Sequence, residues 1–326
     1  MKIQTFVGID VSNDTLDICV YNSMSKESFV INNEVKSIRK FFKQFAGQQL
    51  VIGMENTGRY NWFLYEVLAN LSHIVFVISP LHLKKSMGLI RGKNDKIDAI
   101  RIASFVQKHQ SELTRWKPTP VVIQKLKVLL TERTARIKIK RQLLKQQYDY
   151  NKMKHLRLDK SLLKLNKQLI LAIEKQLMKL ENLITETLET DPSLNKQIAL
   201  MQSIPGVGKI LAWTMIAKTE GFTSIDDPRK MACFSGVVPF QYQSGTSIRG
   251  KNKLSQFADK SIKTILHLAA MSAIRLNNDL RVYYQRKVAE GKNKMSVLNA
   301  VRNKIIHRIF AVIKTETPYK NYLVLS

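Results

Sequence analysis

Short runs of apolar residues alternate with helical segments over the first 115 residues of the chain. The apolar runs lie at 6–9, 15–20, 29–31, 50–54 and 74–78. Each has the length of a β-strand, and the first two are separated by a short polar segment, which predicts a β-hairpin. Helical patterns follow from Tyr60 to Ala69 and from about Asp95 to Val106. This mixture predicts an α/β domain over residues 1–115.

The pattern changes completely between Trp116 and Pro192. After the stiff segment Lys117–Pro120, leucine and isoleucine recur at mainly helical spacings through two long stretches that contain no Gly or Pro. We therefore predict a coiled-coil helical hairpin over residues 116–192, with its turn near 154–159. Such a hairpin could space the two ends of the chain, bind nucleic acid through its many lysines and arginines, or mediate dimerisation, and the pattern leaves these roles open.

The remaining residues, 193–326, are predicted to form a mainly α-helical domain that opens on a glycine turn. Gly206 and Gly208 precede Lys209 and an apolar helix from Ile210 to Ala217. A turn of this kind points backbone N–H groups outward and is similar to the hairpin of helix-hairpin-helix DNA-binding modules. We therefore expect Gly206, Gly208 and Lys209 to contact nucleic acid. Glycines that permit tight packing at a helix start explain the same residues without any ligand.

The charge of the chain narrows the class of partner. Its 53 Lys and Arg residues stand against 25 Asp and Glu residues, a net charge of +28, and such an excess commonly serves to bind a polyanion such as nucleic acid. No run of about 18 apolar residues is present to span a bilayer, and the first residues lack a signal-peptide pattern. Two distant cysteines give no disulfide framework. We expect a cytosolic protein without membrane contact.

Four acids are conspicuous in this basic chain because of where they lie. Asp10 and Glu55 end two of the apolar runs, and Asp95 and Asp98 share one face at the start of a helix. Carboxylates that converge from different elements can hold two divalent ions about 4 Å apart. Hard oxygen ligands without neighbouring His or Cys favour Mg²⁺ or Mn²⁺. A helix cap with a solvated neighbour explains the Asp95–Asp98 pair without a metal.

A polar loop farther along contains Ser244 and Gly245, followed by Arg249, Lys251 and Lys253. A hydroxyl among cations could attack a phosphodiester while the cations steady its developing charge, so we expect these three basic residues to contact nucleic acid. Serine and glycine are also common turn residues, and no histidine lies nearby to act as a base. The local sequence therefore favours an ordinary turn.

Several short motifs occur in one order along the chain, and they carry a family resemblance. They are Gly8–Ser12, Glu55–Gly58, Lys93–Ala99, Ile204–Gly208, and Gly236–Pro239 followed by Gln243–Gly245. In this order they resemble the "one-ten" family of insertion-sequence transposases and the related Piv DNA invertases, over nearly the whole chain. The resemblance implies a RuvC-like, RNase H-like amino-terminal domain, a coiled-coil segment, and a carboxyl-terminal transposase domain with a serine nucleophile.

The resemblance also implies roles for single residues. It places an acid tetrad at Asp10, Glu55, Asp95 and Asp98 and the nucleophile at Ser244, which reverses the local interpretation of that serine. It further implies a recombinase that cuts and rejoins donor and target DNA under the guidance of a bridge RNA. Dimers would assemble into a tetramer whose catalytic sites combine domains of two subunits.

Two alternatives stay open beside this function. One is a RuvC-like metal-dependent nuclease of the Holliday-junction resolvase type, in which water attacks the phosphodiester and the serine has no role. The other is a non-catalytic nucleic-acid-binding protein that keeps the fold. A covalent protein–DNA adduct would separate the recombinase from both, and metal-dependent nicking would separate the two alternatives from each other.

Overall fold

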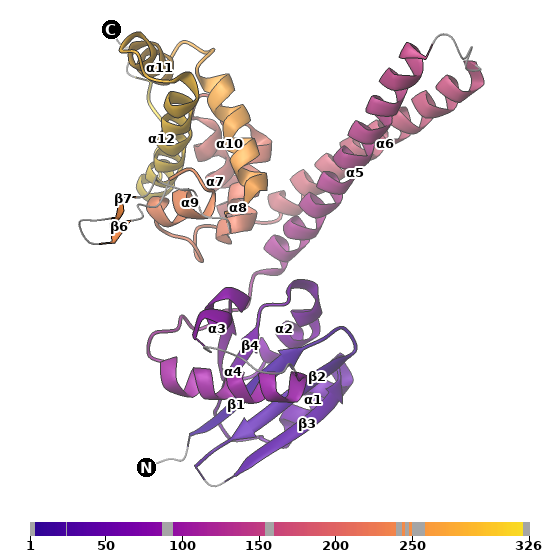
Figure 1. Cartoon of the computed structure of the whole chain (residues 1–326), viewed down its shortest axis with the longest axis vertical. Coiled ribbons are helices and arrows are strands. Elements are labelled where there is room, and N and C mark those ends of the chain that lie inside the picture. Colours follow the sequence, from indigo (N-terminus) through magenta and orange to yellow (C-terminus); the bar gives the residue numbers. More distant parts are fainter. Residues whose placement is uncertain are drawn as a thin grey trace. The chain divides into compact units, whose positions relative to one another are not determined.

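The computed structural model of the chain describes residues 4–23, 25–86, 94–153, 160–238, 243–244, 248–249 and 258–321. The chain divides into two compact units, Met1–Pro118 and Thr119–Ser326. The first unit contains a β-sheet with helices, and the second unit is built almost entirely of helices (Figure 1). The predicted α/β layout, with a sheet in the amino-terminal part followed by helices, is confirmed.

A five-stranded mixed sheet in the order β3-β2-β1-β4-β5 forms the centre of the first unit. Its strands are β1 (Thr5–Val11), β2 (Thr15–Tyr21), β3 (Lys26–Asn32), β4 (Leu50–Glu55) and β5 (Ile74–Ile78). β1 pairs antiparallel with β2 and parallel with β4, and β4 pairs parallel with β5. All five predicted strands and the predicted hairpin are therefore present, and β1 lies at the centre of the sheet.

Helices cover both faces of this sheet. They are α1 (Val35–Lys43), α2 (Trp62–Leu68), α3 (Pro80–Ser86) and α4 (Asp95–His109). Successive side chains of a strand point to opposite faces. Val7 and Ile9 accordingly pack into one core with α1 and α2, while Phe6 packs into another with residues of α3 and α4. Because both faces are buried, the central strands are apolar on both sides, which is why their sequence reads as continuous apolar runs.

The helix predicted from Tyr60 begins two residues later than expected. Residues Gly58–Asn61 form a 3₁₀ turn, and α2 starts at Trp62. The fully buried Asn61 side chain accepts a hydrogen bond from the backbone N–H of Thr57 (2.8 Å) and donates one to the carbonyl of Glu55 (2.9 Å). These bonds fix the chain as it leaves β4, so a side-chain requirement outweighs the helical pattern there.

Two long antiparallel helices begin the second unit, α5 (Val121–Lys152) and α6 (Lys160–Glu189). Ion pairs connect them along their length, with Arg133 2.8 Å from Glu181 and Lys140 2.7 Å from Glu174. The residue numbers rise on one helix as they fall on the other, so the predicted helical hairpin is present. Its turn, expected near 154–159, lies outside the described residues.

The rest of the second unit packs around α12. Its helices are α7 (Pro192–Gln202), α8 (Lys209–Thr219), α9 (Pro228–Phe234), α10 (Lys260–Ala273), α11 (Asp279–Ala289) and α12 (Lys294–Thr315). A single apolar core joins buried residues from all of these helices and from the ends of α5 and α6 nearest to them. Across the residues that the structure describes, none of the helices has the length and apolar character needed to cross a bilayer.

Candidate active site

Three of the four predicted acids meet at one edge of the sheet. Asp10 is the second-last residue of β1, and Asp95 and Asp98 lie in the first turn of α4. One carboxylate oxygen from each residue lies within 4.8 Å of the others. We call these three residues the acid site. Three carboxylates at this separation suit a hard divalent cation, because oxygen is the ligand that Mg²⁺ and Mn²⁺ prefer.

Two glycines bring α4 close enough to form the acid site. Gly8 and Gly53 lie side by side in the paired strands β1 and β4. A Cβ atom at Gly8 would lie 2.1 Å from the carbonyl oxygen of Ala99, and a Cβ at Gly53 would lie 2.3 Å from Cγ2 of Val106. Only glycine permits this approach of helix to strand. The start of α4 is therefore held beside the end of β1.

Adding one methyl group at Gly8 tests this arrangement. We expect Gly8→Ala to lower the free energy of unfolding by about 3 kcal/mol or more, at the upper end of the usual cost of overpacking. The new Cβ would meet the backbone of α4, which cannot rotate away as a side chain can. Thermal melts of the whole chain measure the effect. Gly53→Ala should be milder, because the nearest atoms belong to the side chains of Val106 and Ile102. A Gly8→Ala protein that melts like the wild type would show that α4 does not pack this tightly.

The cap of α4 is a residue other than the two acids. Asn94 holds the N-cap position, and its side-chain oxygen accepts a hydrogen bond from the backbone N–H of Lys96 at 3.0 Å. Capping therefore does not explain Asp95 or Asp98. Asp98 accepts a hydrogen bond from Arg101 at 2.9 Å, one turn along the helix. This ion pair orients the carboxylate, and nothing in the sequence pattern distinguished Arg101 from other helix cations.

The surroundings of Asp10 in the acid site raise the pKa of its carboxyl group. Burial and then the negative charges of Asp95, Asp98 and Glu55 raise the pKa of Asp10 from 3.8 to about 6. A carboxylate among other carboxylates is disfavoured until a cation joins them. A divalent ion held by these residues would relieve their repulsion.

This raised pKa gives a prediction for stability. Between pH 3.8 and about 6 the unfolded chain loses the Asp10 proton while the folded chain keeps it, so the free energy of unfolding should fall as the pH rises through this window and stay low above it. Asp10→Asn removes the titrating group, so this decrease in the free energy of unfolding should not occur in the variant. In EDTA at neutral pH we expect the variant to melt above the wild type, and we expect Mg²⁺ to raise the melting temperature of the wild type alone. A variant that melts lower in EDTA would contradict the assigned repulsion.

Glu55 lies at the same edge of the sheet, at the end of β4. Its neighbour Met54 pairs with Ile9, so β4 ends beside Asp10. The charge of Glu55 contributes to the raised pKa of Asp10, yet among the described residues it is not a member of the compact group of three. The structure thus brings together Asp10, Asp95 and Asp98 and leaves Glu55 adjacent to them.

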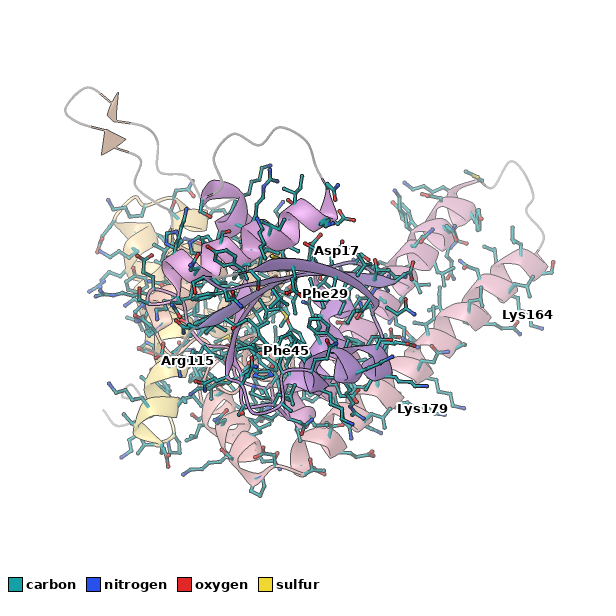
Figure 2. All side chains as sticks on the ribbon, turned by 90° about the horizontal axis from the view of Figure 1, so that it is seen from below. Asp17, Phe29, Phe45, Arg115, Lys164 and Lys179 are labelled. Atoms are coloured by element: carbon teal, nitrogen blue, oxygen red, sulfur yellow. The ribbon has the colours of Figure 1, made fainter. Side chains whose placement is uncertain are left out.

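Asp17 is a fifth acid at this edge that sequence reasoning missed (Figure 2). It pairs directly with Asp10 across β1 and β2, so both side chains point to the face of the sheet that α4 covers. Burial and then the Asp95 carboxylate raise the pKa of Asp17. A signal was present, because an acid within an otherwise apolar alternating strand is unusual.

The predicted serine lies in the second unit, in a very short hairpin. Ser244 belongs to β6 (Gln243–Ser244), which pairs antiparallel with β7 (Ile248–Arg249), and its own register partner is Ile248. Strand pairing thus places the backbones of Ser244 and Arg249 in adjacent strands. The other two predicted cations of this loop, Lys251 and Lys253, lie outside the described residues.

The residues of the glycine turn before α8 mainly make packing contacts and an ion pair within the second unit. Gly206 has a φ of +87°, and a Cβ there would lie 2.5 Å from the carbonyl oxygen of Ala269 in α10. Gly208 is the N-cap of α8, and a Cβ there would meet no atom within 4 Å. Lys209 makes an ion pair with Glu181 at 2.8 Å. Gly206 therefore permits close contact between this turn and α10, while Gly208 leaves the start of α8 open.

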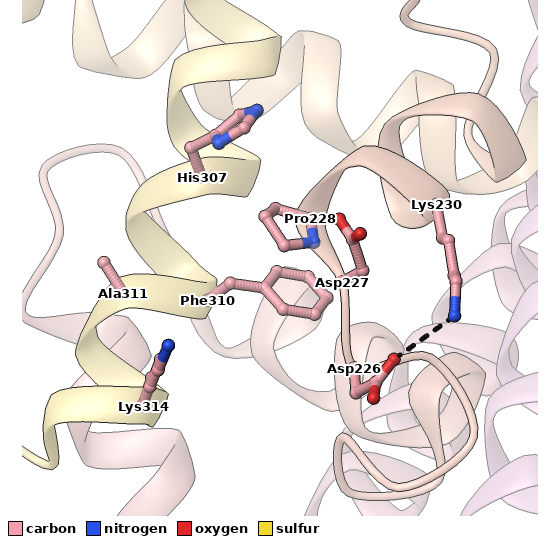
Figure 3. A pocket seen from close by; sticks show the side chains of 8 residues that line it. All are labelled: Asp226, Asp227, Pro228, Lys230, His307, Phe310, Ala311 and Lys314. Carbon is pink, nitrogen blue, oxygen red and sulfur yellow. Dashed lines mark ion pairs between the residues drawn. The ribbon is translucent and has the colours of Figure 1, made fainter.

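A surface pocket of the second unit lies between α9 and α12 (Figure 3). Its lining residues are Asp226, Asp227, Pro228, Lys230, His307, Phe310, Ala311 and Lys314. Lys230 and Asp226 form an ion pair of 3.6 Å within it. The lining contains two carboxylates and two lysines, so the pocket offers neither a cluster of acids for a metal nor a clear excess of positive charge for a phosphate.

Comparison with known proteins agrees with the geometry of the acid site. Residues 7–149 match the sequence profile of a DEDD transposase domain of the IS110 type, and residues 198–285 match that of the transposase IS116/IS110/IS902 family. The matched DEDD domain covers all four predicted acids, which points to metal dependence of this domain. The second domain covers Ser244, Arg249 and the glycine turn.

Relatives with similar sequences extend over almost the whole chain. The pilin gene-inverting protein of Moraxella bovis is 26% identical over 326 residues, which cover 97% of this chain and 98% of that protein. The transposase of insertion sequence element IS1111A from Coxiella burnetii is 23% identical over 346 residues, which cover 98% of this chain and 92% of that transposase. Two profiles of one family match in order along the chain, so this protein belongs to the IS110/IS116/IS902 family of transposases, enzymes that cleave and rejoin DNA.

Proposed function

We propose that this chain is an insertion-sequence recombinase that cuts DNA with Ser244 and needs divalent metal held by Asp10, Glu55, Asp95 and Asp98. The convergence of three of these carboxylates within 4.8 Å supports the proposal most directly. Four aspartate and glutamate side chains from β1, β4 and α4 fit Mg²⁺ or Mn²⁺, since all their donors are hard oxygens. A bound Mg²⁺ would supply a Lewis acid that stabilises charge on phosphodiester oxygens.

The acids and the serine have separate tasks in this scheme. The carboxylates provide fixed negative charge, and Asp98 is held in place by Arg101. The Ser244 hydroxyl loses its proton and attacks phosphorus, forming a phosphoserine ester as the P–O bond to the leaving DNA oxygen breaks. That oxygen gains a proton and becomes a free hydroxyl. A DNA hydroxyl attacking the ester restores the serine and a joined strand, so no ATP is needed.

We further propose a bridge RNA and a tetrameric assembly, both implied by the family resemblance. The net charge of +28 supports binding of two nucleic acids at once. Leu165, Leu169 and Leu171 on α6 are each more than half exposed. Exposed leucines at this density are typical of a surface that another chain covers, which supports self-association through the helical hairpin.

Two experiments test these proposals separately. Protein purified with its nucleic acid should carry one enriched, structured RNA, and sequencing should trace it to DNA that flanks the gene. A random mixture of cellular RNA would contradict the guide. In the second experiment, denaturing gels with labelled DNA should show a covalent protein–DNA adduct that disappears after protease treatment. Metal-dependent nicking without such an adduct would favour the water-attack nuclease, and neither activity would favour the non-catalytic protein.

A further inference from the structure

The second unit buries an arginine that has no acidic partner among the described residues. Arg302 of α12 is only 6% exposed. Its guanidinium lies 2.8 Å from Nδ1 of His267 and donates to Oδ1 of Asn299 at 3.2 Å, while its Nε is buried without a hydrogen-bond partner. Because arginine can only donate, Nδ1 of His267 must accept. The positive charge is therefore solvated by neutral groups alone.

A second cation, Lys263, lies one helical turn before His267 on α10, and His267 is the partner of this arginine. Lys263 of α10 is half-buried, and its stem lies 4.0 Å from where a Cβ of Gly236 would be. Burial and then the charge of Arg302 lower the pKa of Lys263, so the two cations repel each other. In the ranges that the structure describes, no carboxylate pairs with Lys263. The acid four residues before it, Asp259, is engaged with Lys218 at 2.6 Å.

The chain nearby cannot supply the missing negative charge. The segment from Pro239 to Phe257, which contains Ser244, has no Asp or Glu. A buried charge without a partner is destabilising, and a second like charge adds to that effect. An anion from outside the chain would account for these two neighbouring cations. A phosphate bound between them would offset their repulsion through charge-assisted hydrogen bonds.

The two cations lie where both ends of the serine segment are anchored. The carbonyl of Val237 accepts a hydrogen bond from Nδ2 of Asn299 at 2.6 Å, and Asn299 is also the partner of Arg302. At the other end, the N–H of Asp259 donates to the carbonyl of Phe234 at 2.8 Å. The cations therefore lie next to the two points from which the segment with Ser244 departs.

We propose that Lys263 and Arg302 bind a phosphodiester of the DNA strand, with His267 and Asn299 orienting the guanidinium. Lys263 remains partly exposed, so solvent reaches this lysine although Arg302 is buried. The inference depends on the DNA-cleaving activity of the family and is independent of whether Ser244 is the nucleophile. DNA is the chosen source of the phosphate because the site adjoins the anchors of the transposase loop.

Thermal melts of the full chain, with inorganic phosphate as probe, test this site. At constant ionic strength, exchanging chloride for phosphate should raise the melting temperature of the wild type, since a ligand of the folded state stabilises it. Phosphate also stabilises proteins generally, so the informative quantity is the difference between variants. Lys263→Gln should lose the specific part of the rise. In chloride it should melt at or above the wild type, because it removes a like charge.

Matched variants decide between a site and general charge. Lys314→Gln removes a positive charge from an exposed lysine on α12, in the pocket of Figure 3, and should keep the full response. Arg302→Gln should lose the response too, but it breaks buried hydrogen bonds, so Lys263→Gln carries the test if Arg302→Gln does not fold. Equal responses of the wild type and Lys263→Gln, or an equal loss in Lys314→Gln, would overturn the proposal.

Two further arms identify the source of the phosphate. A saturating DNA duplex should abolish the response of the wild type to inorganic phosphate, because its phosphodiester already fills the site. If an RNA duplex of equal length abolishes the response and DNA does not, the assignment to DNA is wrong. Ser244→Ala should respond to phosphate as the wild type does. The serine mechanism can therefore fail while this site stands, and the reverse also holds.

Discussion

Replacing Asp10 or Asp98 by asparagine is expected to abolish strand cleavage while DNA binding changes little. An amide fills the same space as the carboxylate but carries no charge, so it holds a divalent cation weakly. Both residues belong to the group whose oxygens lie within 4.8 Å of one another. The cleavage rate should fall by more than about a hundred-fold. Replacing residues that only hydrogen-bond to a metal ligand already lowers activity by about 10–100-fold, and Asp10 and Asp98 are proposed to be ligands themselves. Nicking of labelled DNA in Mg²⁺ measures cleavage, and a filter or gel assay measures binding.

Asp14→Asn is the matched control for this experiment. Asp14 lies in the turn between β1 and β2, only four residues from Asp10, but its side chain is exposed. The substitution makes the same change of charge on the same hairpin, and cleavage should persist. Wild-type rates in Asp10→Asn or Asp98→Asn would refute the metal assignment. Equal loss in Asp14→Asn would mean that the effect comes from the hairpin and not from metal binding.

Local sequence patterns were enough to expect that these acids lie close together, and their role in metal binding stays a prediction. Asp10 lies next to the end of β1 and Glu55 ends β4. The ends of neighbouring parallel strands meet at one edge of a sheet, so strand assignment alone brings these acids near each other. Asp95 and Asp98 required only helical spacing. The approach of α4 to β1 was beyond prediction, since it depends on Gly8 facing the backbone of Ala99. A glycine within a strand signals a close contact without naming its partner.

The two cations of the second unit, Lys263 and Arg302, could not be identified from local sequence patterns. Along α12 the sequence places Arg302 between Val301 and Asn303, which is ordinary for an amphipathic helix whose basic side chains reach solvent. Only the packing of α10 against α12 buries Arg302 and brings it beside Lys263. Burial is a tertiary property, so no spacing rule could single out these two residues among 53 lysines and arginines.

The glycine turn illustrates how structure separates two explanations of one motif. Nest-like phosphate binding and tight packing both require glycine, and the sequence fits both. The structure assigns Gly206 to packing, because any side chain there would strike α10. Gly208 has open space beside it and begins α8 without a side-chain cap. Contact with nucleic acid at this turn stays a prediction, and Gly208 is the better position at which to test it.

Ser244→Ala is expected to remove both the covalent protein–DNA adduct and strand exchange. An alanine side chain has no nucleophile, so no phosphoserine ester can form. The substitution removes one oxygen from a residue of the two-residue strand β6, and folding should change little. The adduct is measured on denaturing gels with labelled DNA, and exchange by recovery of recombined donor and target. Melting curves of the variant check that the fold is intact.

The control for this variant is the neighbouring hydroxyl. Ser247 lies three residues farther along, outside the described residues, and is the obvious substitute nucleophile, so Ser247→Ala should retain the adduct. Mg²⁺-dependent nicking helps to separate the mechanisms, because a nuclease that uses water does not need the serine hydroxyl. If Ser244→Ala still forms a protease-sensitive link to DNA or still recombines its substrates, the serine mechanism is wrong. If it keeps metal-dependent nicking at the wild-type rate and no adduct forms with either protein, the acid site acts alone through water.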